Sequence, residues 1–112
     1  MIKLNKDIKR DFFAVRLSFS ENENEIGHAY LYIIYNDLHK KPYGLLEDVF
    51  IEEKYRGSGL GTKLLIDVIA EAKKNDCYKL IATSRLEREK IHDWYLKQGF
   101  KEYGKEFRLD FE

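Results

Sequence analysis

The sequence predicts a mixed α+β fold, in which a mostly antiparallel central sheet is flanked by helices, within a single domain of residues 1–112. Near the N-terminus, apolar residues fall at every second position, which is the period of a half-buried strand. After Gly59 the apolar spacing changes to three and four residues, the period of an amphipathic helix. A chain of 112 residues has enough material for one hydrophobic core.

Two strands and a turn are predicted first. Residues 12–20 alternate apolar and other residues, as a strand with one buried face does. The polar segment 21–27 indicates a turn. Residues 30–35 form an aromatic and β-branched run, which is typical of a strand that lies centrally and is covered on both faces.

A third strand is predicted at residues 45–51, where two carboxylates interrupt the apolar pattern. Glu47 and Asp48 belong to residue types that are depleted in strands. Placing a carboxylate there is costly unless it is exposed or serves a function. We therefore treat both residues as candidate bases.

The C-terminal half predicts two helices and more strand. Leu60 to Asn75 carries one apolar stripe, and a short apolar run follows at 78–83. Residues 84–87 have the Ser-x-x-Glu pattern of a capping box, which indicates that a second helix begins there and stops at Gly99. A final strand pair is predicted after that glycine, because apolar residues alternate with charged ones at Phe107, Leu109 and Phe111.

Composition excludes several classes of protein. Lys plus Arg and Asp plus Glu number 20 each, so no net positive charge favours binding to nucleic acid. Cys77 is the single cysteine, and no Cys or His spacing fits a structural zinc site. No apolar run approaches about 18 residues, and the N-terminus lacks a signal-peptide pattern. We expect a cytoplasmic protein that binds no membrane, nucleic acid or metal.

A glycine-rich turn precedes the long helix, with the sequence Tyr55-Arg56-Gly57-Ser58-Gly59-Leu60-Gly61-Thr62. Its backbone N–H groups open the helix at the positive end of the helix dipole, which favours phosphate. Glycine lets the backbone approach an anion closely, and Arg56 adds a charged contact. The spacing fits neither a P-loop nor the Gly-x-Gly-x-x-Gly dinucleotide motif. On this motif alone, a turn without a ligand is the alternative.

The pattern Arg56-x-x-Gly59-x-Gly61 resembles the pyrophosphate loop of the GNAT superfamily of acetyl-CoA-dependent N-acetyltransferases. A second segment, Trp94-Tyr95-Leu96-Lys97-Gln98-Gly99-Phe100, is similar to that family's motif at the end of a helix. The resemblance covers roughly residues 45–111, and the part from Leu45 to Arg56 is similar to the spermidine/spermine acetyltransferase branch. It implies a truncated GNAT-like fold that lacks the family's N-terminal strand and helices.

The resemblance implies transfer of an acetyl group from acetyl-CoA to a primary amine, by direct attack in a ternary complex. Glu47 would deprotonate the amine, and Tyr95 would protonate the leaving thiolate. A tyrosine at a pKa of about 10 can protonate a thiolate of pKa about 8.5 at a cost of only about 2 kcal/mol. The backbone of Phe50 and Ile51 would hold the pantetheine arm. The pyrophosphate would be held by Arg56, Gly57, Ser58, Gly59, Leu60, Gly61 and Thr62.

Alternatives stay open for each residue. In the simplest alternative, Glu47 and Asp48 have no catalytic role and are either solvated or paired with lysines. If a base is present, Asp48 or a water chain could take this role in place of Glu47. Tyr95 shares a helix face with core aromatic residues. Arg88 and Ile91 stand where many family members have Asn and Ala.

The acceptor and the activity class also stay open. The acceptor is a small-molecule or peptide amine, and its cleft is either open or completed by the second subunit of a homodimer. His92 lies three residues before the tyrosine, but we expect helix packing or a structural hydrogen bond from it rather than catalysis. The alternative of another class is a non-catalytic module that binds or senses acyl-CoA.

Overall fold

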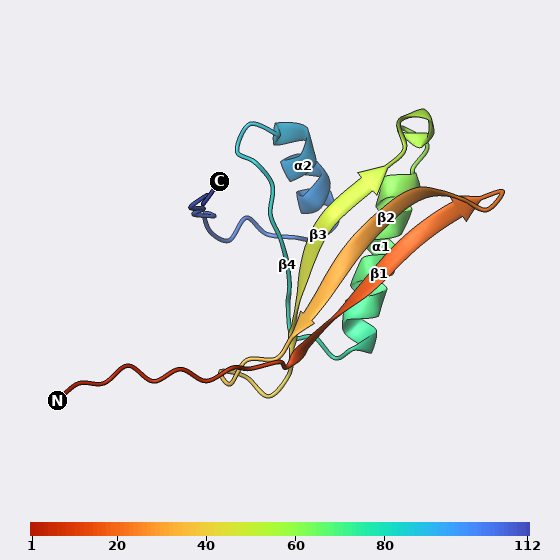
Figure 1. Ribbon diagram of the computed structural model, residues 1–112. Helices are drawn as coiled ribbons and strands as arrows, with labels where there is room; N and C mark the ends of the chain where they lie inside the picture. Colours follow the sequence, from red (N-terminus) through yellow and green to blue (C-terminus); the bar gives the residue numbers. More distant parts are fainter. The chain divides into compact units, whose positions relative to one another are not determined.

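The computed structural model describes residues 1–112, and the chain forms two compact units, 1–82 and 83–112. The first unit contains the sheet and the longer helix, and the second contains the shorter helix (Figure 1). This is the mixed α+β class that the sequence predicts. In chain order the elements are β1 (Phe12–Glu21), β2 (Asn24–Ile34), β3 (Tyr43–Ile51), the 3-10 helix η1 (Glu53–Tyr55), α1 (Leu60–Lys74), β4 (Leu80–Ala82) and α2 (Glu89–Lys97).

The four strands form one sheet in the order β1-β2-β3-β4. The first two pairings are antiparallel and the last is parallel, so the prediction of a mostly antiparallel sheet is confirmed. β2 lies inside the sheet, as predicted, but its two faces differ. Leu31 and Ile33 are fully buried, whereas Tyr30 and Tyr32 on the opposite face are only half-buried. The prediction that this strand is covered on both faces is therefore wrong.

The turn between β1 and β2 is shorter than the predicted segment 21–27. Asn22 and Glu23 both have positive φ, at 52° and 68°. Two consecutive left-handed residues form the kind of two-residue turn whose twist matches that of the flanking strands. β2 therefore begins at Asn24, and Glu25 lies in a strand rather than in a loop.

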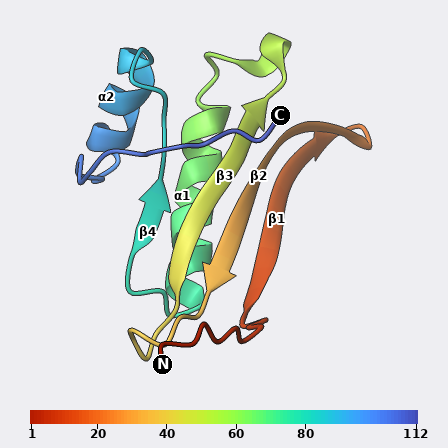
Figure 2. The same cartoon turned by 60° about the vertical axis from the view of Figure 1, so that its left-hand side comes forward.

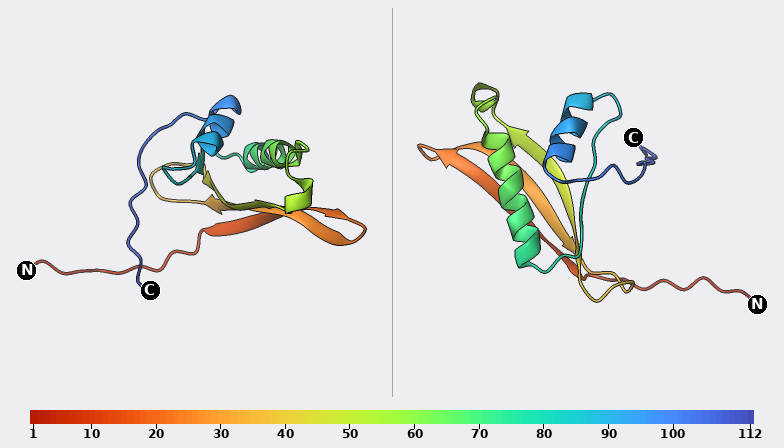
Figure 3. Two further views of the ribbon diagram at one scale, coloured as in Figure 1. Left: turned by 90° about the horizontal axis from the view of Figure 1, so that it is seen from above. Right: turned by 180° about the vertical axis from the view of Figure 1, so that it is seen from behind.

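Helix α1 packs on one face of the sheet (Figure 3). It starts at Leu60 and ends one residue before the predicted Asn75, so the apolar spacing predicted its bounds well. Its inner side is buried against strand residues such as Leu31 and Leu46. The helix residues on this side are Leu64, Leu65, Val68 and Ala72.

Strand β4 pairs with only the first part of β3. The parallel register joins Gly44–Leu46 to Leu80–Ala82, while β3 continues alone to Ile51 on that side (Figure 2). Gly44 permits the close approach, because a Cβ there would lie 3.0 Å from Leu80 Cδ1. The sheet therefore loses its fourth strand just before Glu47.

In the second unit, the predicted capping box is wrong. α2 begins at Glu89, and its preceding residue, Arg88, makes no side-chain cap hydrogen bond. The Arg88 N–H instead bonds to the Arg85 carbonyl at 3.1 Å, which closes a separate turn before the helix. Ser84 Oγ is buried without a partner. The predicted stop is confirmed, because Gly99 has φ 96° and follows the end of the helix.

The predicted C-terminal strand pair is also wrong. Residues 100–112 have no strand structure, and the sheet consists of β1–β4 alone. Phe107 and Phe111 are 91% and 93% exposed. An alternating sequence becomes a strand only when a neighbouring strand bonds to its backbone, and this segment has none. No helix of the chain has the length and apolar character needed to cross a membrane.

Candidate functional site

The glycine-rich turn leads from η1 into the N-terminus of α1. Gly57 has φ 80° and Gly59, the residue before the helix, has φ 88°. Residues with a side chain rarely adopt a positive φ, so the backbone conformation of the turn requires glycine at both positions. A Cβ added at either position would meet no atom within 4 Å, which leaves open space beside the backbone.

The start of α1 leaves backbone donors for a ligand. The first bond within the helix runs from the Lys63 N–H to the Gly59 carbonyl at 3.1 Å, so the amides of Leu60 and Gly61 precede it. No acidic residue lies in the first turn of the helix. Exposed N–H groups at the positive end of a 15-residue helix attract an anion. Thr62 lies in the same turn and is half-buried.

Contacts to the preceding elements hold the turn in place. Arg56 Nε donates a hydrogen bond of 2.8 Å to the carbonyl of Ile51, the last residue of β3. Its guanidinium also lies over the Phe50 ring, 5.6 Å from the centroid. The Ser58 hydroxyl donates to the Tyr55 carbonyl at 2.5 Å. The turn therefore has a defined conformation, and these residues fit a bound phosphate or pyrophosphate.

A β-bulge shapes β3 at the two predicted carboxylates. Tyr30 pairs with Glu47 and His28 pairs with Phe50, so β3 has one more residue than β2 in this stretch. Asp48 lies in the bulge with φ 53°. Residues directly opposite each other share a face, so Glu47 lies on the Tyr30 side of the sheet, away from α1.

The two carboxylates have different surroundings. Asp48 Oδ2 lies 3.0 Å from His28 Nε2. Glu47 is exposed and makes no hydrogen bond or ion pair. Neither carboxylate is paired with a lysine, so that part of the alternative reading is wrong, whereas Glu47 is solvent-exposed as that alternative also allowed. Glu47 is therefore the carboxylate that a substrate can approach without displacing a protein partner.

Phe50 and Ile51 form the end of β3 beyond the point where β4 stops pairing. Ile51 is buried opposite Gly27, and Phe50 is 41% exposed. Because β4 pairs only up to Leu46, this part of β3 has an edge that no strand of the sheet covers. A free strand edge offers backbone N–H and C=O groups to an extended ligand.

Tyr95 belongs to α2 in the second unit. Its ring lies 5.1 Å from Trp94 and 5.1 Å from Phe100, between centroids. Burial raises the pKa of its phenol. His92, three residues earlier, has Nε2 2.7 Å from the Arg85 carbonyl. The predicted structural hydrogen bond of His92 is thus confirmed.

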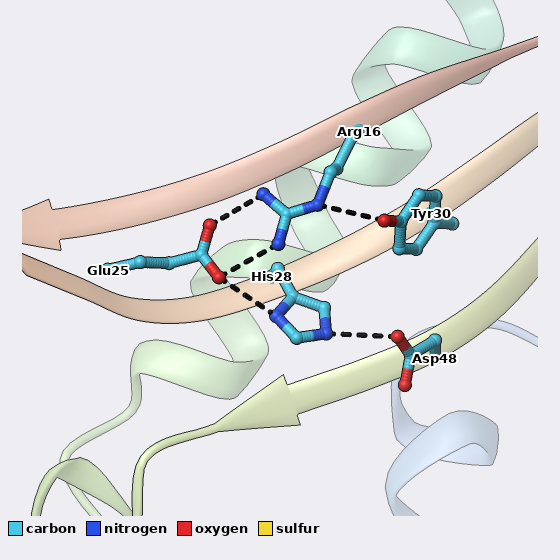
Figure 4. Close-up of polar contacts among 5 residues, drawn as sticks. All are labelled: Arg16, Glu25, His28, Tyr30 and Asp48. Atoms are coloured by element: carbon cyan, nitrogen blue, oxygen red, sulfur yellow. Dashed lines mark hydrogen bonds and ion pairs between the residues drawn. The ribbon is translucent and has the colours of Figure 1, made fainter.

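Sequence reasoning missed a polar network on the exposed face of the sheet. Arg16 from β1 holds both carboxylate oxygens of Glu25, at 2.5 and 2.8 Å. His28 contacts Glu25 and Asp48 through its two ring nitrogens, so the network crosses three strands (Figure 4). The missed signal was strand alternation. His28 and Tyr30 share a face because β2 begins before residue 30, where the predicted strand began, and Arg16 lies opposite Tyr30.

Comparison with known proteins identifies the family. The model of the acetyltransferase (GNAT) family matches residues 3–100, which is most of the chain and includes the glycine turn, Glu47 and Tyr95. The chain belongs to the GNAT family. The resemblance carried by its two motifs is confirmed, and so is the predicted GNAT-like fold.

Two GNAT relatives with named substrates are similar to this chain. Glucosamine 6-phosphate N-acetyltransferase of Trypanosoma brucei brucei is 39% identical over 67 residues, covering 60% of this chain and 44% of the relative. Aminoglycoside N(6')-acetyltransferase type 1 of Stenotrophomonas maltophilia is 31% identical over 80 residues, covering 71% of this chain and 50% of the relative. The chain therefore spans about half the length of these relatives.

A solved structure shows the same GNAT fold. The crystal structure of an acetyltransferase from Trypanosoma brucei superposes with a TM-score of 0.80 at 32% identity. The match covers 87% of this chain and 68% of the other. The chain therefore shares its fold with a known acetyltransferase.

Proposed function

We propose that this GNAT chain is an N-acetyltransferase that transfers an acetyl group from acetyl-CoA to a primary amine. The observation that carries the proposal is the glycine turn, where the left-handed Gly57 and Gly59 leave open space at the N-terminus of α1. A pyrophosphate fits this position because it is anionic and needs close backbone N–H donors. The two named relatives, a glucosamine 6-phosphate and an aminoglycoside N-acetyltransferase, support the same reaction.

Acetyl-CoA supplies the acetyl thioester when it is bound. The turn residues Arg56–Thr62 hold the pyrophosphate in this proposal, and the free edge at Phe50 and Ile51 holds the pantetheine arm. The uncovered edge of β3 supports this assignment, because an extended arm can bond to it as a strand would. The binding energy of these contacts positions the thioester for attack.

Glu47 accepts the proton of the amine at its carboxylate, directly or through a water molecule. A lysine-like amine has a pKa near 10.4, so only about one molecule in 10³ is neutral at pH 7. A base at the site therefore increases the reactive fraction. The exposure of Glu47 and its lack of a protein partner support this role over one for Asp48, whose oxygen contacts His28.

Tyr95 holds a proton at its phenol oxygen and gives it to the leaving thiolate. Burial raises the pKa of this phenol, so it stays protonated throughout the neutral range, as a proton donor must. The surrounding Trp94 and Phe100 rings fix the orientation of the side chain. Residues 1–112 act together as one domain in this proposal.

The acceptor is a small-molecule or peptide amine. The named relatives favour a small-molecule amine, since one is named for glucosamine 6-phosphate and the other for aminoglycosides. We propose the cytoplasm as the location, because the lone Cys77 suits a reducing compartment. A homodimer is the proposed arrangement in which a second subunit completes the acceptor cleft.

Thiol release from acetyl-CoA tests the proposal. The purified chain is mixed with acetyl-CoA and with amino sugars, aminoglycosides, polyamines, amino acids or lysine peptides, and thermal stabilisation by acetyl-CoA is measured in parallel. We expect turnover with at least one amine class. Glu47→Gln should lower kcat about 10²- to 10⁴-fold at pH 7, which is the usual effect of losing a general base. That defect should shrink as the pH approaches the amine pKa.

The control variant is Glu53→Gln, which removes an exposed carboxylate in η1 and should keep full activity. Stabilisation by acetyl-CoA without turnover on any amine would favour the acyl-CoA sensor instead. No stabilisation at all would show that the glycine turn binds no CoA.

A further inference from the structure

His28 lies between two carboxylates on the exposed face of the sheet. Its Nδ1 is 3.2 Å from Glu25 Oε2, and its Nε2 is 3.0 Å from Asp48 Oδ2 (Figure 4). The His28 side chain is 18% exposed, so water competes only partly for these contacts. The Tyr30 and Phe50 rings pack beside the imidazole, at centroid distances of 6.1 and 5.6 Å.

The geometry of this arrangement fits a hydrogen bond from the imidazole to Asp48. An ionised carboxylate only accepts hydrogen bonds, so the donor in this contact is Nε2–H of His28. The charged groups around the imidazole are Glu25, Asp48 and, across Glu25, Arg16. The polar contacts of His28 therefore connect β2 with β3, and Arg16 extends the network to β1.

The contact with Asp48 bears on the shape of β3. A non-glycine residue in the left-handed region costs about 1–2 kcal/mol, so the φ of 53° at Asp48 needs support from its surroundings. In regular alternation Asp48 would follow Leu46 onto the buried α1 face. The bulge instead turns its carboxylate to His28, on the face that also carries Glu47.

We propose that His28 is a positioning residue, which holds Asp48 in the bulge and thereby orients the adjacent Glu47 carboxylate toward the amine. This inference rests on the proposed function, in which Glu47 is the base. His28 itself touches neither the amine nor the thioester.

Turnover of His28 and Asp48 variants tests the coupling. His28→Gln should lower kcat at least ten-fold while the Kd for CoA, measured by calorimetry, changes less than two-fold. Glycine adopts a positive φ without strain, so in an Asp48→Gly background the same His28→Gln change should alter kcat less than two-fold. His39→Gln, which changes a histidine in the loop before β3, is the matched control and should leave kcat unchanged. An equal loss of kcat from His28→Gln in both backgrounds would overturn the inference.

A measurement without turnover separates this inference from the proposed function. In ¹H–¹⁵N NMR spectra of the unliganded chain, His28→Gln should shift the amide signals of Asp48 and Val49, and the same change in an Asp48→Gly background should leave the Val49 signal in place. Amide signals of the bulge that do not respond to His28→Gln would contradict the positioning role. Absence of turnover in the wild type, with the NMR coupling present, would count against the proposed function alone.

Discussion

Burial raises the pKa of Tyr95, and this shift sets the pH range in which the residue can donate a proton. A phenol with an ordinary pKa of about 10 is already protonated at neutral pH. A raised pKa extends that range upward and makes donation slightly less favourable. The loss of activity on deprotonation of Tyr95 should therefore appear at a higher pH than that at which an ordinary tyrosine titrates.

Replacing Tyr95 by phenylalanine removes the phenol oxygen and keeps the ring between Trp94 and Phe100. We expect kcat to fall about 10²- to 10⁴-fold, with the Kd for CoA nearly unchanged. Steady-state thiol release and calorimetry measure the two quantities. Tyr103→Phe, at a position that is 97% exposed, is the control. Wild-type kcat in Tyr95→Phe would leave Tyr95 as a packing residue only.

Glu25 gives a prediction on stability against pH. Hydrogen bonds from Arg16 lower its pKa from 4.5 to about 2, and His28 contributes in the same direction. A depressed carboxyl pKa stabilises the fold above the unfolded value, and this contribution is lost as the pH falls toward the folded value. In urea unfolding, wild type and Glu25→Gln should differ by a constant free energy above pH 5. The difference should shrink between pH 4.5 and about 2. A difference that stays constant down to the lower limit would contradict this assignment.

At the scale of the secondary-structure element, anion binding by the N-terminus of α1 depends on the glycine turn that precedes it. The helix supplies the dipole, and the left-handed glycines bring backbone donors to its end. A side chain at Gly59 would both strain the backbone and occupy the open space beside it. The binding function of α1 therefore depends on a residue that lies just outside the helix.

Gly59→Val should weaken CoA binding at least ten-fold for these two reasons, as measured by calorimetry. Gly61→Ala is the matched control, because Gly61 has no positive φ and its added Cβ would meet Ile51 Cγ1 at an ordinary 3.8 Å. We expect Gly61→Ala to bind CoA within about three-fold of wild type and to gain some of the roughly 1 kcal/mol by which alanine exceeds glycine in helices. Unchanged affinity in Gly59→Val would remove the turn from the cofactor site.

At the scale of the whole molecule, the hydrophobic core belongs to the first unit. The buried apolar residues run from Ile26 to Ala72, whereas no residue of α2 is fully buried and Tyr95 is half-buried. Stability of a domain is only about 5–15 kcal/mol, so one large cavity in this core removes a substantial part of it. The core between α1 and the sheet should therefore control global unfolding.

Leu65→Ala should lower the free energy of unfolding by about 2–5 kcal/mol, because Leu65 is 1% exposed and its removal leaves a cavity. Ile66→Ala, one residue further along α1 and 53% exposed, should change it by no more than about 0.5 kcal/mol. Chemical denaturation followed by circular dichroism gives both values. Similar losses in the two variants would mean that α1 does not pack on the sheet by the face described.

The sequence predicted the elements whose pattern is long and periodic. α1 was predictable because its apolar stripe runs through four turns, and the glycine turn because its spacing is specific. The bulge at Asp48 was not predictable, since a positive φ at a non-glycine residue depends on partners such as His28 from another strand. The predicted capping box at Ser84 and the predicted C-terminal strand pair were wrong for the same reason. Each local pattern needs a partner elsewhere in the structure, and neither has one.

The hydrogen bond from Arg56 to the end of β3 has a consequence for the kinetics of binding. A loop already tethered to a strand loses little configurational entropy when an anion arrives, so association does not wait for the loop to order. Cutting the tether with Arg56→Leu should slow the association of CoA as well as speed its dissociation.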